Sequence, residues 1–292
     1  MKPALFAYHR PQTVAAALAL LAEFDDAKLL AGGQSLGPML NLRVARPAHV
    51  IDLNDLLELD FVRRQPGLLE IGSLTRHHRL ATDAEVAAAC PILAAAAASI
   101  GHYAIRQRGT LGGSLAHADP AAQLPLIATL LNAEIAVAGR TGTRMVRARE
   151  FFVSSLVTSV QPEEMIVAVR FPAFPPSQGW GLEIFSQRHG DFAIVSVAAT
   201  VTCAPTGKVA ELDVALGGIG ATPLSLHERL APFRGRVPDA DWSAELGSVA
   251  ASAVALEDDA RIPAAYRREL AMTLTQRALM AAVERGEERN NG

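Results

Sequence analysis

The chain has 292 residues, of which 50% are hydrophobic and 20% are charged, a composition typical of a soluble protein with a sizeable core. Its formal net charge is −3 and there is no basic tail or stripe, which argues against nucleic acid as the main partner. The two cysteines, Cys90 and Cys203, are too few to hold an iron–sulfur cluster on this chain alone, and they favour a reducing compartment over a disulfide framework.

Strands alternate with helices in the first quarter of the chain. We expect short strands at residues 5–8, 28–31, 47–52 and 68–71. Between the first two strands, residues 12–23 have the spacing of an amphipathic helix. This mixture favours α+β or α/β layers over a helical bundle. His77 and His78 are neighbours and point in different directions on a helix or a strand, so we expect them at the surface and not as metal ligands.

Two helices are expected between residues 82 and 101. Thr82 or Asp83 can cap a helix that runs to residue 89, because a side-chain oxygen there can accept an N–H of the first turn. Pro91 can begin the next helix, and Gly101 can end it.

Two glycine pairs are the most informative local feature, in Gly32-Gly33-Gln34-Ser35-Leu36 and Gly112-Gly113-Ser114-Leu115. A Gly-Gly turn presents bare backbone N–H groups, and no side chain keeps a bulky anion away. A buried strand or tight loop is expected before each pair, at residues 28–31 and 106–111. Neither run is a Walker A loop or a Gly-x-Gly-x-x-Gly fingerprint. We interpret them as two loops that close on one diphosphate; ordinary connecting turns are the alternative.

A helix over residues 120–131 is expected directly after the second pair, with Asp119 as its N-cap and Pro120 at its first position. Its N-terminus would point back toward the glycine turn, where it would favour an anion. Residues 134–138 and 143–148 then predict a hairpin.

The proline-rich run 171–177 indicates a domain boundary. Beyond it we expect a small antiparallel sheet with strands at residues 180–187, 192–203 and 208–217. The expected closing helices are residues 223–230, 242–256 and 264–285.

Four strings occur in order along the chain: Ala31-Gly32-Gly33-Gln34-Ser35-Leu36, Ile105-Arg106-Gln107-Arg108-Gly109-Thr110-Leu111-Gly112-Gly113-Ser114, His117-Ala118-Asp119-Pro120-Ala121-Ala122, and Arg188-His189-Gly190-Asp191-Phe192-Ala193. Together they resemble the FAD-binding medium subunit of the molybdenum hydroxylases, the family of carbon monoxide dehydrogenase and xanthine dehydrogenase. The resemblance covers nearly the whole chain.

The resemblance implies an α+β fold. A two-subdomain FAD-binding domain of the vanillyl-alcohol-oxidase (PCMH) type would occupy residues 1–175, with subdomains of about 1–54 and 55–175. A C-terminal flavoprotein domain, a small antiparallel sheet with helices, would follow at residues 176–292.

The resemblance also implies a cofactor site, with no catalytic residue and no metal ligand on this chain. The FAD-binding residues it implies are Ala31, Gly32, Gly33, Gln34, Ser35, Leu36, Thr110, Leu111, Gly112, Gly113, Ser114, Leu115, Asp119, Gln123 and Phe192. Gln123 stands where many relatives have an acidic residue, and its amide can still hydrogen-bond a ribose or an adenine edge. Phe192 corresponds to a position near the isoalloxazine ring.

The implied function is electron transfer through FAD, from two-iron two-sulfur clusters on a small partner subunit to an external acceptor. Hydroxylation would occur at a molybdopterin cofactor on a large partner subunit, in a cytoplasmic complex expected to be a dimer of heterotrimers. We expect neither a nucleic-acid partner nor a membrane span. The alternatives are a stand-alone FAD-dependent oxidase or reductase of the same fold and a non-catalytic interaction module.

Overall fold

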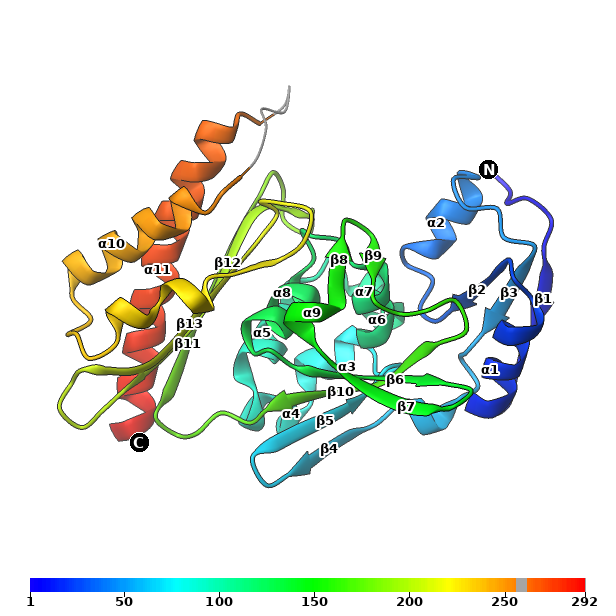
Figure 1. Ribbon diagram of the computed structural model, residues 1–292, viewed down its shortest axis with the longest axis horizontal. Coiled ribbons are helices and arrows are strands. Elements are labelled where there is room, and N and C mark those ends of the chain that lie inside the picture. The colour runs from blue at the N-terminus through cyan, green and yellow to red at the C-terminus, as the bar shows by residue number, and fades with distance from the viewer. Residues whose placement is uncertain (256–261, 292) are drawn as a thin grey trace.

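The computed structural model of the chain describes residues 1–255 and 262–291. Three parts, each with a sheet of its own, follow one another along the long axis of the molecule in sequence order (Figure 1). The element types confirm the expected α+β fold.

The N-terminal part is a three-stranded parallel sheet in the order β1-β3-β2. Its elements are β1 (Ala7–His9), α1 (Val14–Glu23), β2 (Ala27–Leu30), α2 (Leu36–Asn41) and β3 (His49–Asp52). Helix α1 begins because the Thr13 side chain accepts the Ala16 N–H, and it buries Leu18 and Leu21. These leucines pack with Ile51 of β3 and with Leu74 and Met165 of the middle part, so an apolar cluster joins the two parts.

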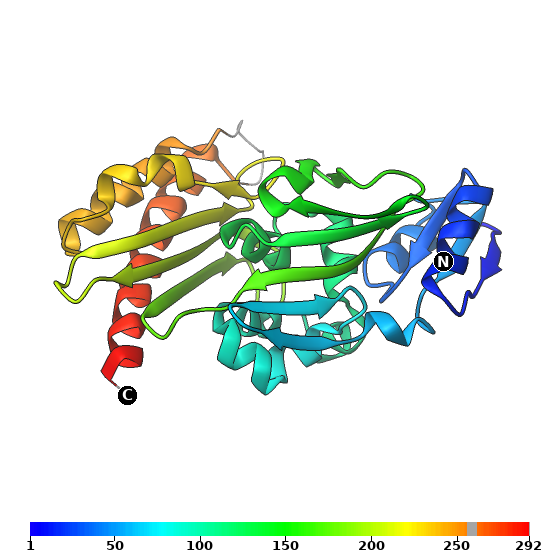
Figure 2. The ribbon, with the colours of Figure 1, turned by 60° about the horizontal axis from the view of Figure 1, so that its bottom comes forward.

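The middle part is a five-stranded antiparallel sheet in the order β4-β5-β10-β6-β7, with helices on one face (Figure 2). Its strands are β4 (Val62–Gln65), β5 (Leu68–Gly72), β6 (Glu134–Gly139), β7 (Gly142–Arg147) and β10 (Met165–Pro172), and β8 (Phe152–Ser154) pairs separately with β9 (Val157–Thr158). Its helices are the 3-10 turn η1 (Leu57–Leu59), α3 (His77–Thr82), α4 (Ala84–Ala89), α5 (Pro91–Ser99), α6 (Tyr103–Arg108), α7 (Leu111–His117), α8 (Gln123–Leu130) and α9 (Ala148–Phe151). Asp83 caps α4 and Pro91 begins α5, as the sequence predicts.

The C-terminal part is a four-stranded antiparallel sheet in the order β11-β12-β13-β14. Its elements are β11 (Gln178–Ser186), β12 (Ala193–Cys203), β13 (Val209–Gly217), β14 (Leu224–Ser225), the 3-10 turns η2 (His227–Arg229) and η3 (Ala231–Phe233), and the helices α10 (Ala240–Ser252) and α11 (Ala264–Asn291). One face of this sheet packs on α5 and α8, and α11 lies on β11 and β12. A Cβ on Gly179 would come within 1.8 Å of the Ala282 carbonyl oxygen, so glycine lets α11 sit directly on β11.

Several predicted elements differ in the structure. Residues 106–111 are neither strand nor tight loop, because α6 runs to Arg108 and α7 begins at Leu111. Residues 223–230 form no α-helix, because Leu224 pairs with β13 as part of β14. The helix predicted at 242–256 is α10, and the last predicted residue lies outside the described part of the chain.

Asp119 does not cap the helix that follows it. Helix α8 begins at Gln123 with Ala122 as its N-cap, and the Asp119 carboxylate instead accepts the Ala121 N–H at 2.8 Å in a turn. The Pro120 carbonyl accepts the N–H of Gly218, at the end of β13, at 2.9 Å. This contact joins the segment before α8 to the C-terminal sheet, and the helix starts three residues later than the sequence predicts.

Among the described helices, none is long and apolar enough to cross a membrane.

Candidate functional site

The two glycine pairs lie side by side where the N-terminal and middle parts meet. A Cβ on Gly32 would lie 2.1 Å from the carbonyl oxygen of Arg108, the last residue of α6. A Cβ on Gly113 would lie 3.9 Å from the Cβ of Ala31. The loops that the sequence predicts to act together are therefore neighbours, although about 80 residues separate them in the chain.

The first pair forms an open loop between β2 and α2. Gly33 has φ +67°, a backbone conformation that favours glycine. The loop is half-buried, and the N–H groups of residues 32–36 have no hydrogen-bond partner within the described parts of the chain. Ser35 precedes α2 without a side-chain cap on the helix. This segment is a run of unpartnered donors, the arrangement that binds anionic oxygens in proteins.

The second pair differs, because Gly112 and Gly113 lie in the first turn of α7 and form no turn of their own. The Gly113 N–H is accepted by the Thr110 hydroxyl at 3.1 Å and the Gly112 N–H by the Ser73 carbonyl at 2.8 Å. A Cβ on Gly112 would lie 2.6 Å from the Ser73 Cβ. This pair therefore allows close packing of α7 on the segment after β5, and the expectation of a second open glycine turn is wrong.

The remaining predicted site residues differ in exposure. Leu111 and Leu115 are fully buried in the main core, whereas Gly113 and Ser114 are half-buried. Gln123 is only 5% exposed, and its side-chain amide has no hydrogen-bond partner among the residues the structure describes. The amide nitrogen and oxygen are not among the fully buried unpartnered atoms of the described residues, so they can still hydrogen-bond water or a ligand at the surface.

Phe192 lies on the connection between β11 and β12 and is 62% exposed. In the same connection, a Cβ on Gly190 would lie 2.8 Å from the His102 ring. His102 is the N-cap of α6, the helix whose C-terminal carbonyl lies against Gly32. The connection that carries Phe192 therefore reaches one end of α6, and the first glycine loop reaches the other.

His77 is buried beside Thr110, the N-cap of α7, so the expectation of a surface residue is wrong. Its Nε2 lies 2.9 Å from the Thr110 carbonyl oxygen, while Nδ1 has no partner. Burial lowers the pKa of His77 to about 4, so the ring is neutral at pH 7 and Nε2 donates its proton to that carbonyl. The backbones of Arg76 and Thr110 form a β-bridge, which places His77, the next residue after Arg76, against the start of α7.

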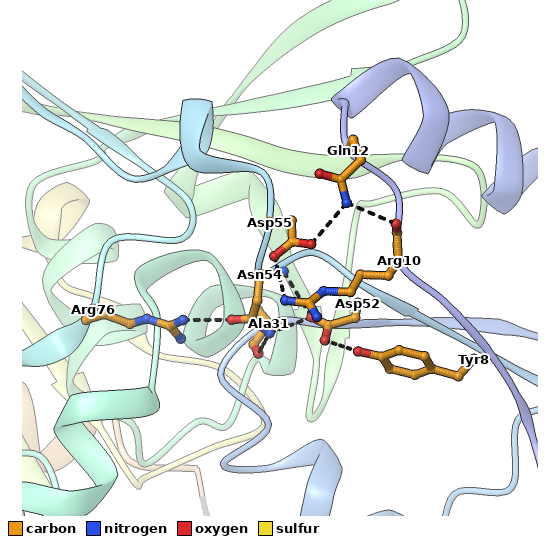
Figure 3. A network of polar contacts seen from close by, with 8 residues as sticks. All are labelled: Tyr8, Arg10, Gln12, Ala31, Asp52, Asn54, Asp55 and Arg76. Carbon is orange, nitrogen blue, oxygen red and sulfur yellow. Dashed lines mark hydrogen bonds and ion pairs between the residues drawn. The ribbon is translucent and has the colours of Figure 1, made fainter.

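Sequence reasoning also missed Asn54 and Arg76, which join the two loops through hydrogen bonds (Figure 3). Neither residue belongs to a recognisable motif, and their pairing arises only when β3 and the start of α3 come together.

Comparison with known proteins defines the class. Residues 4–174 match the family described as the FAD-binding domain in molybdopterin dehydrogenase, and residues 180–282 match the CO dehydrogenase flavoprotein C-terminal domain. The chain belongs to this family of FAD-binding medium subunits, and FAD is the cofactor of the family. The resemblance inferred from the four sequence strings is confirmed.

Individual relatives match over almost their whole length. The solved structure of carbon monoxide dehydrogenase from Hydrogenophaga pseudoflava superposes with a TM-score of 0.94 at 35% identity, over 98% of this chain and 99% of that chain. Caffeine dehydrogenase subunit beta of Pseudomonas sp. (strain CBB1) is 38% identical over 98% of this chain and 97% of its own. The carbon monoxide dehydrogenase medium chain of Afipia carboxidovorans is 33% identical over 98% of this chain and 99% of its own.

Proposed function

We propose that this chain is the electron-transfer subunit of a molybdenum hydroxylase, with FAD bound between the first glycine loop and the start of α7, where the second glycine pair lies. The observation that carries the proposal is the run of unpartnered N–H groups over residues 32–36, next to the start of α7. Bound FAD would supply the redox chemistry, taking electrons from iron–sulfur clusters of a partner and giving them to an external acceptor. Family membership supports this assignment.

Each predicted site residue has a proposed task. The backbone from Ala31 to Leu36 would hold the diphosphate, since its donors need anionic acceptors. Gly113 and Ser114, half-buried at the start of α7, would flank the same group, with Thr110, Leu111, Gly112 and Leu115 shaping that turn from behind. The amide of Gln123 and the carboxylate of Asp119 would face the ribose or the adenine, and Phe192 would lie near the isoalloxazine ring.

The proposed partners are a large molybdopterin subunit and a small subunit with two-iron two-sulfur clusters. The names of the relatives support this, since several are called medium chains or medium subunits. We propose a dimer of such heterotrimers in the cytoplasm, where the free thiols of Cys90 and Cys203 would stay reduced. We also propose the domain division at residues 175 and 176, with the N-terminal subdomain ending near residue 54; the family models, which match up to 174 and from 180, support the first boundary.

Purification of the chain alone and together with its partners tests the proposal. The isolated chain should bind FAD with the yellow absorption of a flavoprotein, and organic substrates should not bleach it until both partners are added. Substrate-dependent bleaching of the isolated chain would instead indicate a stand-alone oxidase or reductase. A colourless chain, even after addition of FAD, would indicate a non-catalytic module.

A further inference from the structure

The loops that we propose to hold FAD are joined by two side chains, Asn54 and Arg76. The Asn54 side-chain N–H donates to the Ala31 carbonyl at 2.9 Å, directly before Gly32. Arg76 donates from one guanidinium nitrogen to the Asn54 side-chain oxygen at 2.7 Å and from the other to the Arg108 carbonyl at 2.5 Å. In Figure 3 the three residues Ala31, Asn54 and Arg76 form one continuous chain of contacts.

These contacts form a closed ring. The Arg108 carbonyl oxygen that accepts from Arg76 is the atom that lies against Gly32, at 2.1 Å from an ideal Cβ. From Gly32 the backbone leads to Ala31, whose carbonyl accepts from Asn54, and from Asn54 the contacts lead back to Arg76. The relative position of the two loops therefore depends on two side chains outside both glycine motifs.

Hydrogen bonds to both the nitrogen and the oxygen fix the orientation of the Asn54 side-chain amide. Its nitrogen donates to the Ala31 carbonyl and to the Asp52 carboxylate, and its oxygen accepts from Arg76. Asp52 is 8% exposed and also accepts from the Tyr8 hydroxyl and from the Asn54 backbone N–H. Because donors and acceptor are all used, only an amide with this assignment satisfies the ring.

Hydrogen bonds to uncharged oxygens hold the Arg76 side chain in place, and no ion pair does so among the described residues. The guanidinium is half-buried, and no carboxylate in the described part of the chain lies within ion-pair distance of it. Its two acceptors are both uncharged oxygens, one on each side of the junction. A planar guanidinium can reach both at once, which the single ammonium of lysine cannot do in the same geometry.

We propose that Asn54 and Arg76 act together as positioning residues for the cofactor site, by fixing the first glycine loop against the end of α6. The proposal rests on the proposed function, because it assumes that FAD binds between these loops. The pair touches the backbone of the loops and needs no contact with FAD. Its loss should therefore weaken FAD binding in a chain that still folds.

The experiment compares FAD dissociation constants of the full chain, stripped of flavin, at a temperature well below its thermal midpoint. Arg76→Lys keeps the charge and loses the two-armed contact, and Asn54→Asp keeps the acceptor and loses both side-chain donors. We expect each to raise the dissociation constant about tenfold or more. Arg79→Lys is the matched control, because Arg79 lies on α3 one turn away and pairs with Asp60 and Asp83 at the surface.

A double-mutant cycle separates positioning from general destabilisation. If the pair acts as one unit, the double variant should bind FAD about as well as the weaker single variant, whereas additive losses would contradict a joint role. A dissociation constant for Arg76→Lys equal to that of Arg79→Lys would also overturn the proposal. Gly33→Val separates the positioning role from the proposed FAD site. If Gly33→Val abolishes FAD binding while the Asn54 and Arg76 variants bind FAD normally, only the positioning role fails. If Gly33→Val also binds FAD normally, the proposed site itself fails.

Discussion

At the first glycine pair, Gly32-Gly33, the backbone N–H groups have no partner among the described residues, whereas at the second pair, Gly112-Gly113, oxygens of the chain accept them. The sequences look alike, since Ser35 stands two positions after the first pair and Ser114 directly after the second. The difference is that the first pair lies in a loop and the second inside α7. The comparison teaches that similar glycine pairs can differ in what accepts their N–H groups: the second pair serves packing, and the first has free donors for the ligand that we propose.

The largest expected effect concerns Gly33, whose φ is +67°. A β-branched residue disfavours this conformation, and its side chain would fill the space that we propose for the diphosphate. We expect Gly33→Val to lower the FAD content of the purified chain to less than about a tenth of the original. Absorbance of the flavin relative to protein measures this directly.

Gly67 offers a matched control for that substitution. It has φ +70° in the β4–β5 turn, with open space around an added Cβ. Gly67→Val imposes a similar backbone strain far from the loops, so FAD content should stay near the original. Equal losses in both variants would mean that strain alone, and not a cofactor site, explains the effect at Gly33.

The second effect, smaller in its influence on FAD, concerns Gly112. An added Cβ would lie 2.6 Å from the Ser73 Cβ and 2.9 Å from the Ser73 carbonyl oxygen, so α7 must shift. We expect Gly112→Ala to lower the free energy of unfolding of the flavin-free chain by about 1–3 kcal/mol, as for other overpacked sites. Denaturant titration measures this, with Gly37→Ala as the control because an added Cβ there meets open space. A fully stable Gly112→Ala chain would contradict the packing role.

The third effect is a pH dependence of the free energy of unfolding, and it comes from His77, beside the second glycine pair. Burial lowers the pKa of His77 to about 4, below its value of about 6.5 in an unfolded chain. The contribution of neutral His77 to the free energy of unfolding is fully present above pH 6.5. It falls as the pH drops toward 4, because the histidine of the unfolded chain takes up a proton at a higher pH than that of the folded chain. At pH 5 the loss should be about 2 kcal/mol.

A variant isolates the contribution of this ring. His77→Gln can still donate to the Thr110 carbonyl and does not titrate, so its stability between pH 6.5 and 5 should fall less than that of the original chain. Denaturant midpoints at several pH values provide the measurement. Parallel curves for the two chains would show that His77 does not stay neutral in the folded state.

Local sequence patterns predicted much of the fold correctly. The hairpin of β6 and β7, the caps at Asp83 and Pro91, and the three long strands of the C-terminal sheet all rest on contacts between near neighbours in the chain. The predictions failed where distant segments decide the structure. Asp119 does not cap α8, and the Pro120 carbonyl before that helix accepts the Gly218 N–H of the C-terminal sheet. His77 is buried next to the bridge between Arg76 and Thr110.

The candidate site shows the same limit. The order of the glycine motifs predicts the two loops, and the structure brings them together. At the second glycine pair, Ser73 and Thr110 already accept the N–H groups of Gly112 and Gly113. The contact with Ser73 joins distant parts of the chain, so the sequence pattern does not predict it. Asn54 and Arg76 carry no motif at all, and their ring exists only once the N-terminal and middle parts are assembled.

Amide hydrogen exchange, measured with and without FAD, tests the contrast between the two glycine pairs most directly. Residues 32–36 should exchange quickly in the flavin-free chain and become protected when FAD binds, because their N–H groups then gain acceptors. Gly112 and Gly113 should be protected in both states. No change at residues 32–36 on addition of FAD, together with a large gain at Gly112 and Gly113, would contradict the account.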